Sequence, residues 1–323
     1  MQSFQIDHAK RVKGKDRLAL PDMGIFPSQL MNRRTFLQKS SIATTILLAN
    51  QLAAALKKEP TLKISLAQWT VNKEIRAGKI DNLDFAKVAK DHGIEAIEYV
   101  NQFFMDKAND ACYLSEMDKR AKDLGVKQLL IMCDREGNIG DPDSAKRSQT
   151  VENHKKWLDA AKRLGCHSIR VNAGSAGTWE EQTKLASDGL ARLTELGAKM
   201  DLNVIVENHG GLSSNADWLT EVIKKVGHPR CGTLPDFGNF RIRDGESYDS
   251  YKGIKKLLPW AKGVSVKDKV WDDCNHNSDL DYDKMLGIVY ESGFQGYCGI
   301  EFGGYDGLHQ SREKLQTAIN NLF

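Results

Sequence analysis

Apolar runs of seven to nine residues recur along the chain from residue 62 onward, and each is followed by a polar loop and a longer amphipathic stretch. Runs rich in Val and Ile predict buried strands, and the longer stretches predict helices. We count eight rounds. The predicted strands are 62–70, 94–100, 126–133, 167–173, 202–208, 231–237, 263–269 and 297–303, and the predicted helices are 81–92, 111–124, 148–164, 179–200, 216–226, 248–258, 281–292 and 309–321.

Residues at the helix ends support this division. A glycine follows five of the predicted helices and fits a left-handed C-cap, and two aspartates precede helices as N-caps. The glycines are Gly93, Gly125, Gly165, Gly227 and Gly293, and the aspartates are Asp81 and Asp281.

Eight alternations of strand and helix in about 265 residues predict an α/β fold, a (β/α)8 TIM barrel. No linker or composition break divides residues 60–323, so we expect a single domain there. A doubly wound open sheet is the alternative. It is disfavoured because Gln68, Trp69, Thr70 and Val71 stand where that fold carries a glycine-rich phosphate loop.

The N-terminal segment follows a different pattern. Residues 31–58 begin MNRRTFLQKSS, continue with the uncharged run IATTILLANQLAAAL and end in two lysines. This order resembles twin-arginine export leaders, so we expect residues 1–55 to be a signal peptide and the protein to be periplasmic or otherwise exported. The apolar run is about five residues short of the ~20 that span a bilayer, which disfavours a permanent membrane anchor. Met31 is an alternative start of the chain, and mature peptides from residues 1–30 would exclude it.

Charge separates the leader from the domain. Residues 1–55 carry a net charge of +5 and the whole chain +3, so the other 268 residues carry −2. A nucleic-acid-binding domain would show a basic excess, and we therefore expect no nucleic-acid partner. Cys133, Cys231 and Cys298 lie in apolar strand runs, and no Cys-x-x-Cys pair occurs. This favours buried thiols over disulfides or metal ligands, although export would bring an oxidising compartment.

Polar side chains gather where the predicted strands end, which in a barrel is the end that carries reactive groups. Side chains alternate along a strand, so Glu207 and His209 share one side, as do Ser265 and Lys267. The set comprises Glu98, Asn172, Glu207, Asn208, His209, Asp236, Asn239, Lys267, Asp268 and Glu301.

Three of these acids, Glu207, Asp236 and Glu301, are expected to converge on one point. Uncompensated carboxylates repel and raise one another's pKa, so a divalent cation or an ammonium group should lie between them. Oxygen ligands suit Mg²⁺ or Mn²⁺, and His209 as a nitrogen ligand would shift the preference toward Mn²⁺, Co²⁺ or Zn²⁺.

The motifs at these strand ends resemble the xylose-isomerase-like TIM barrels, the sugar (phosphate) isomerase and epimerase superfamily that also includes inosose dehydratases and an endonuclease branch. The resemblance covers about residues 60–320. It rests on Ile94-Glu95-Ala96-Ile97-Glu98, Val206-Glu207-Asn208-His209, Leu234-Pro235-Asp236-Phe237-Gly238-Asn239, Val266-Lys267-Asp268 and Gly299-Ile300-Glu301.

The resemblance implies a divalent ion, most simply Mn²⁺ or Mg²⁺, with Glu207, Asp236 and Glu301 as ligands. The family's strand 7 motif, His-x-Lys-Asp, begins here with Ser265, so the nitrogen ligand is missing. Three outcomes stay open. Water or Ser265 completes a weaker oxygen-rich site, His209 or His276 reaches the ion, or Lys267 neutralises the carboxylates without a metal.

The implied activity is carbohydrate isomerisation or epimerisation, in which a base removes a proton next to a carbonyl while a cation stabilises the enediolate. Glu207 and Glu301 are the expected acid/base pair, and Lys267 is the expected oxyanion stabiliser. The expected substrate-binding residues are His209, Asn239, Trp69 and Glu98; for Glu98, pairing with a lysine or arginine beneath the site is the alternative.

Other functions remain open. A lyase or dehydratase acting on a keto sugar, of 3-keto-glycoside or inosose type, would begin with the same proton abstraction, and a non-catalytic sugar-binding barrel is a further alternative. The endonuclease branch is disfavoured by the domain's negative charge. The expected partners are a small carbohydrate and the twin-arginine translocation machinery, and a homo-oligomer stays open.

Overall fold

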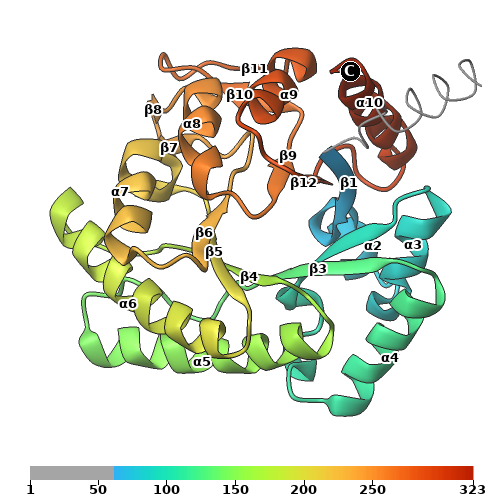
Figure 1. The fold of residues 1–323 in the computed structure, drawn as a ribbon, viewed down its shortest axis with the longest axis horizontal. Helices are drawn as coiled ribbons and strands as arrows, with labels where there is room; N and C mark the ends of the chain where they lie inside the picture. Colours follow the sequence, from blue (N-terminus) through green and yellow to red (C-terminus); the bar gives the residue numbers. More distant parts are fainter. Residues whose placement is uncertain (1–61, 323) are drawn as a thin grey trace, which may run out of the picture. The chain divides into compact units, whose positions relative to one another are not determined.

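The barrel is built from parallel strands. A computed structural model of the chain describes residues 62–322, so the predicted leader lies outside the described residues. The described part contains one eight-stranded sheet in the order β6-β5-β4-β3-β2-β1-β12-β9, and all neighbours along it are parallel. Figure 1 shows these strands in the centre with helices around them.

Each of the eight predicted strands and eight predicted helices has a counterpart. The sheet strands are β1 (Leu62–Ala67), β2 (Ala96–Val100), β3 (Lys127–Met132), β4 (Ser168–Val171), β5 (Asn203–Glu207), β6 (Cys231–Leu234), β9 (Val264–Val266) and β12 (Gly296–Ile300). The helices are α2 (Asn72–Arg76), α3 (Phe85–Asp91), α4 (Ala111–Asp123), α5 (Ser144–Arg163), α6 (Trp179–Lys199), α7 (Ala216–Val226), α8 (Ser250–Leu257), α9 (Tyr282–Glu291) and α10 (Leu308–Asn320). The short α2 was not expected from the sequence pattern.

Isolated bridges join the two ends of the sheet. They link Thr233 to Ala261 and Asp236 to Ser265 in parallel, which brings β6 and β9 side by side. The sheet therefore closes on itself almost completely, and the predicted (β/α)8 barrel is confirmed. The alternative, a doubly wound open sheet, is excluded because its edge strands would stay unpaired.

Local sequence signals determine where the helices begin and end. All five glycines predicted to end helices have positive φ values, between 63° and 77°, where a side chain would be strained. Asp81 and Asp281 accept hydrogen bonds from backbone amides of the following turn, as N-caps do. The helix predicted over 148–164 begins earlier, at Ser144, because Asp143 caps the first turn there.

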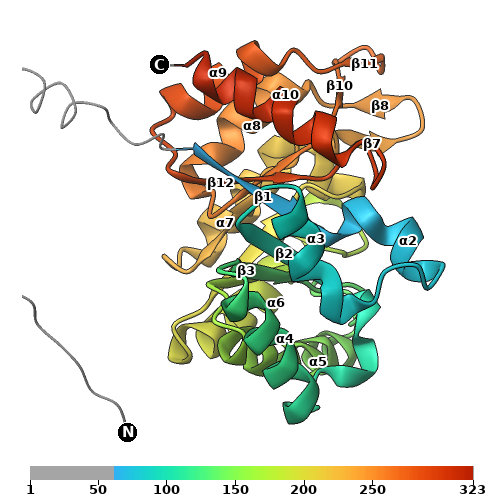
Figure 2. The ribbon, with the colours of Figure 1, turned by 90° about the vertical axis from the view of Figure 1, so that its right-hand side faces the viewer.

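Two short hairpins interrupt the alternation. β7 (Arg241–Arg243) pairs with β8 (Glu246–Ser247), and β10 (Lys269–Trp271) pairs with β11 (Asn277–Asp279), both antiparallel. The predicted strand 263–269 is therefore wrong in extent, since its last residue belongs to β10. In Figure 2, α2 and both hairpins lie on one side of the barrel, where the sheet strands end, so they border its mouth.

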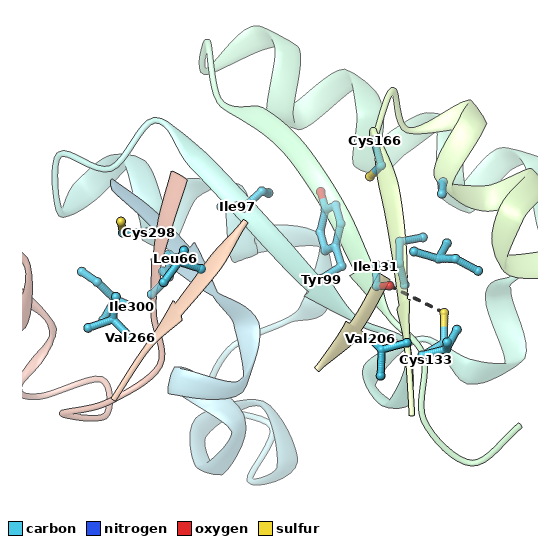
Figure 3. Close-up of a cluster of buried hydrophobic side chains, with 14 of the residues drawn as sticks. Leu66, Ile97, Tyr99, Ile131, Cys133, Cys166, Val206, Val266, Cys298 and Ile300 are labelled. Carbon is cyan, nitrogen blue, oxygen red and sulfur yellow. Dashed lines mark hydrogen bonds between the residues drawn. The ribbon is translucent and has the colours of Figure 1, made fainter. Parts of the chain in front are cut away.

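The core surrounds the strands, and it contains thiols. Cys133, Cys166, Cys231 and Cys298 are buried, and all six cysteines of the chain are unpaired. Figure 3 shows three of them among buried apolar side chains such as Val266, with the Cys133 thiol 3.6 Å from the carbonyl oxygen of Ile131. The prediction of buried thiols rather than disulfides is confirmed. In residues 62–322, no helix is long and apolar enough to cross a membrane.

Candidate active site

A cavity of about 260 Å³ opens at the carboxyl ends of the barrel strands, as expected for an active site in this fold. Half of its lining consists of residues that the sequence analysis singled out: Trp69, His209, Asn239, Lys267 and Glu301. The other half consists of Val100, Gln102, Met132, Asp134 and Arg170.

Three carboxylates converge at the floor of this cavity. Glu207 ends β5, Asp236 lies two residues beyond β6 and Glu301 directly follows β12. Each has an oxygen within 4.8 Å of the other two, so the predicted convergence is confirmed. Glu301 lines the cavity, whereas Glu207 and Asp236 lie beneath it with at most 1% of their surface exposed.

Lys267 neutralises two of these carboxylates. Its Nζ is paired with the Oε1 of Glu301 and lies 3.5 Å from the Oδ2 of Asp236. Ser265, two residues earlier on the same side of β9, donates its hydroxyl to the Oε2 of Glu301 at 3.0 Å. Burial alone would lower the pKa of Lys267, but the three surrounding carboxylates raise it above its ordinary value, so the side chain carries a full positive charge at neutral pH.

The third carboxylate pairs with an arginine. Arg170, on β4, places its Nε 2.9 Å from the Oε2 of Glu207, in an ion pair whose angles do not form a hydrogen bond. Its Nη1 donates to the Oδ1 of Asp134 at 2.8 Å. Asp134 also accepts hydrogen bonds from Gln102 and Asn172. Burial would raise the pKa of Asp134, but the guanidinium of Arg170 and these hydrogen bonds lower it to about 2.

Two asparagines order the loop after β6. Asn239 donates its side-chain amide to the Oε1 of Glu207 at 2.9 Å. The backbone amides of Gly238 and Asn239 both donate to the Oδ1 of Asp236 at 2.8 Å. Asn208 exchanges two hydrogen bonds with the backbone of Asp236. The loop therefore holds both buried carboxylates in fixed positions.

Burial tunes the acidity of the buried carboxylates. It raises the pKa of Glu207 to about 7, because the neighbouring carboxylates add to the effect of burial and Arg170 only partly offsets it. Burial likewise raises the pKa of Asp236, with Lys267 opposing the shift. A carboxyl group with a pKa near 7 accepts and returns a proton at neutral pH, as general acid–base catalysis requires.

The mouth of the cavity combines aromatic and polar groups. Trp69 is half-buried and packs against Phe103, with ring centroids 6.2 Å apart, and the guanidinium of Arg76 lies 5.4 Å from the centroid of Trp69. His209 is exposed at the opposite wall. Aromatic faces beside polar groups suit a ring with one apolar face and several hydroxyls. His276 does not line the cavity; it lies in the β10–β11 turn against Asp272.

Glu98 is placed differently from the other predicted site residues. It does not line the cavity, and only 1% of its surface is exposed. Its Oε1 accepts a hydrogen bond from Ser65 at 2.6 Å. Its carboxylate also lies so close to Gly299 that a Cβ there would be 2.6 Å from Oε1. Among residues 62–322 no lysine or arginine pairs with Glu98, and burial raises its pKa to about 8.

This shift makes the stability of the protein depend on pH. Folded Glu98 keeps its proton up to about pH 8, whereas an unfolded glutamate releases it near 4.5. The free energy of unfolding should therefore fall as pH rises through that window, by up to about 1.4 kcal/mol per pH unit from this group. We expect Glu98→Gln to remove that fall. Urea unfolding of both proteins at pH 5, 6, 7 and 8 measures the difference, and a difference independent of pH would contradict the assignment.

The resemblance implies a metal ion at the three carboxylates. The positively charged side chains that already pair with these carboxylates do not fit such an ion. The oxygens are close enough, but Lys267 already pairs with Glu301 and Asp236, and Arg170 pairs with Glu207. The position of the nitrogen ligand is taken by Ser265, whose hydroxyl donates to Glu301. An ion bound here would face an ammonium group across the same oxygens, and like charges repel.

Arg170, Asp134 and Gln102 were not predicted as site residues, although the sequence contains a signal for Arg170. Asn172 was noted at the end of β4, and side chains two residues apart point the same way. Arg170 therefore had to point into the barrel. Asp134 lies in a loop and Gln102 in the short 3-10 helix Asn101–Phe103, where no periodicity predicts the direction of a side chain.

Comparisons with known proteins agree with the fold. Among solved structures, 3-keto-D-glucoside 4-epimerase from E. coli is 16% identical and covers 80% of this chain and 99% of its own, with a TM-score of 0.59. A probable 3-DHS dehydratase from Bacillus anthracis is 17% identical and covers 79% and 98%, with a TM-score of 0.58. The IolI protein, solved with a zinc atom, is 15% identical and covers 80% and 97%, with a TM-score of 0.62.

No curated protein matches the sequence. The model of one sequence family does, over residues 86–322, and that family is described as xylose isomerase-like TIM barrel. The match begins within α3, ends just past α10 and includes Glu207, Asp236, Lys267 and Glu301. The barrel and the strand-end carboxylates lead to the same result: the chain belongs to the xylose isomerase-like TIM barrel family.

Proposed function

We propose that this chain is a carbohydrate isomerase or epimerase that removes a proton from the carbon next to a carbonyl group. The observation that carries the proposal is the convergence of Glu207 and Glu301 beside Lys267 at the floor of the cavity. This arrangement supplies carboxylates to move a proton and a fixed positive charge to stabilise the enediolate oxygen.

The side chains take distinct roles in this reaction. Glu301 lines the cavity and contacts the substrate. Glu207 lies beneath the cavity and is the second acid/base group, with a pKa of about 7. Asp236 holds Lys267 in place. His209 and Asn239 contact hydroxyl groups, and the face of Trp69 packs on the sugar ring.

A dehydratase or lyase is the second candidate. It shares the opening proton abstraction and then expels an oxygen from the next carbon. A dehydratase is among the structures similar to this chain, and export would favour an unphosphorylated keto sugar as substrate. The same carboxylates serve this reaction, because the leaving oxygen takes a proton from one of them.

Hydrogen exchange in D₂O tests the proposal. The protein is incubated with a panel of free ketoses and keto-glycosides, and the products are followed by NMR. We expect deuterium to enter the carbon next to the carbonyl in at least one substrate, with an epimer or isomer appearing. An α,β-unsaturated product would show that the chain is a lyase and not an isomerase. Tight sugar binding without exchange would show a non-catalytic binding protein.

Export is a separate proposal that rests on the sequence of residues 31–58. The twin arginine Arg33–Arg34, the uncharged run and the flanking lysines support a leader read by the twin-arginine translocation machinery. Replacement of both arginines by lysine should leave the protein in the cytoplasmic fraction of a host that has this machinery. Export of this variant at the level of the parent chain would contradict the proposal.

A further inference from the structure

Lys267 lies at the centre of the carboxylate cluster. Ser265, two residues before it, bridges to Asp236 on one side and pairs with Gly299 on the other. Lys267 therefore lies level with the ends of both neighbouring strands, and its Nζ reaches both Asp236 and Glu301. An internal positive charge thus occupies the place between the acids of β6 and β12.

The side chain of Lys267 passes closely over Gly238. A Cβ on Gly238 would lie 3.0 Å from both the Cβ and the Cγ of Lys267, and 2.9 Å from the carbonyl oxygen of Lys269. Gly238 has an ordinary backbone conformation, since its φ is not among the positive values. Glycine at this position provides space, and that space is filled by the lysine stem. Only 19% of the Lys267 side chain is exposed.

The carboxylate oxygens have partners that an ion would have to displace. Both oxygens of Glu301 are engaged, by Lys267 and by Ser265. In Glu207, Oε1 accepts from Asn239 and Oε2 faces Arg170. The Oδ2 of Asp236 is buried without a hydrogen bond and faces the ammonium group.

We propose that the ammonium group of Lys267 takes the place of a divalent cation in this barrel, and that the chain works without a bound metal ion. The role of Lys267 in the reaction rests on the proposed function, whereas the exclusion of metal does not. In the reaction, the carboxylate base takes the proton from the carbon next to the carbonyl group. The C–H electron pair then forms the C=C bond of the enediolate, and the carbonyl oxygen takes the negative charge. The N–H groups of Lys267 stabilise that oxygen, and the proton then returns to carbon.

Metal binding can be measured without knowing the substrate. The full chain and three variants are purified, treated with chelator and titrated with Mn²⁺, with bound metal followed by electron paramagnetic resonance and elemental analysis. The variants are Lys267→Met, Ser265→His with Lys267→Met, and Lys156→Met. Lys156 is the matched control, because it too pairs with a buried glutamate, Glu136, at 2.9 Å, and lies outside the cavity.

We expect less than about 0.1 equivalent of metal on the parent chain and on Lys156→Met. The double variant restores a nitrogen ligand and removes the ammonium group, so it should bind close to one equivalent of Mn²⁺. Lys267→Met alone should bind Mn²⁺ at least tenfold more weakly than the double variant and more tightly than the parent. The single variant keeps the test valid if the double variant fails to fold.

Stoichiometric metal on the parent chain, or exchange activity that chelator abolishes and Mn²⁺ restores, would overturn the proposal. So would a double variant that folds and still binds no Mn²⁺. A parent chain that holds no metal and exchanges no hydrogen on any substrate would instead overturn the proposed function and leave the exclusion of metal in force.

Discussion

Replacing Glu301 by Gln should lower kcat about 10²- to 10⁴-fold while the protein stays folded. Glu301 is the carboxylate that lines the cavity, so it meets the substrate directly. Gln has nearly the same size, and its amide oxygen can accept from Lys267 while its NH2 group donates to the Ser265 hydroxyl, but it cannot take a proton. The readout is the rate of deuterium incorporation into the ketose or keto-glycoside identified as substrate, with the melting temperature as the check on folding.

Glu136→Gln is the matched control. Glu136 is also a buried carboxylate paired with a lysine, at 2.9 Å from Lys156, and it does not line the cavity. We expect its exchange rate to stay within about twofold of the parent. If Glu301→Gln retained a similar rate, Glu301 would not be an acid/base group, and the proposed mechanism would lose its central residue.

Glu207→Gln separates the two carboxylates. Because Glu207 is the second acid/base group, we expect this substitution to lower kcat at least about 100-fold with little change in KM. The amide can keep the hydrogen bond from Asn239, because its Oε1 is still an acceptor. A loss smaller than tenfold would reduce Glu207 to a positioning residue for Arg170 and Asn239.

The fold could be predicted because its signal is redundant. Each of the eight rounds repeats the same apolar run, and the glycines and aspartates at the helix ends agree with it, so an error in one boundary does not change the result. The β7–β8 and β10–β11 hairpins were missed because they lie inside loops. Asp244-Gly245 at the first turn, with Gly245 at φ 75°, was the available signal.

The site could be predicted only in part. Glu207, Asp236 and Glu301 were found because all three end barrel strands, and the ends of parallel strands meet. Their partners could not be assigned in the same way. Which carboxylate Lys267 reaches depends on the tilt of β9 against its neighbours, and a stem of four methylene groups can take many paths. The sequence therefore left metal and lysine as open alternatives.

Replacing Arg170 by Met should destabilise the protein by about 3–5 kcal/mol. Arg170 is 4% exposed and lies between Asp134 and Glu207. Its removal would leave two carboxylates near the cavity without their cation, and the cost of an unpaired buried charge is large. Urea unfolding of the full chain at pH 7 measures the change. Arg120→Met is the matched control, since Arg120 also pairs with two acids, Asp84 and Glu116, but is 38% exposed.

An exposed arginine of this kind contributes at most about 1 kcal/mol. Equal losses for Arg170→Met and Arg120→Met would therefore contradict a buried charge network beneath the cavity. A compensating variant sharpens the test, because the expected loss comes from the carboxylates left behind rather than from the arginine itself. Adding Asp134→Asn and Glu207→Gln to Arg170→Met removes both charges, so most of the lost stability should return even though no ion pair has been restored.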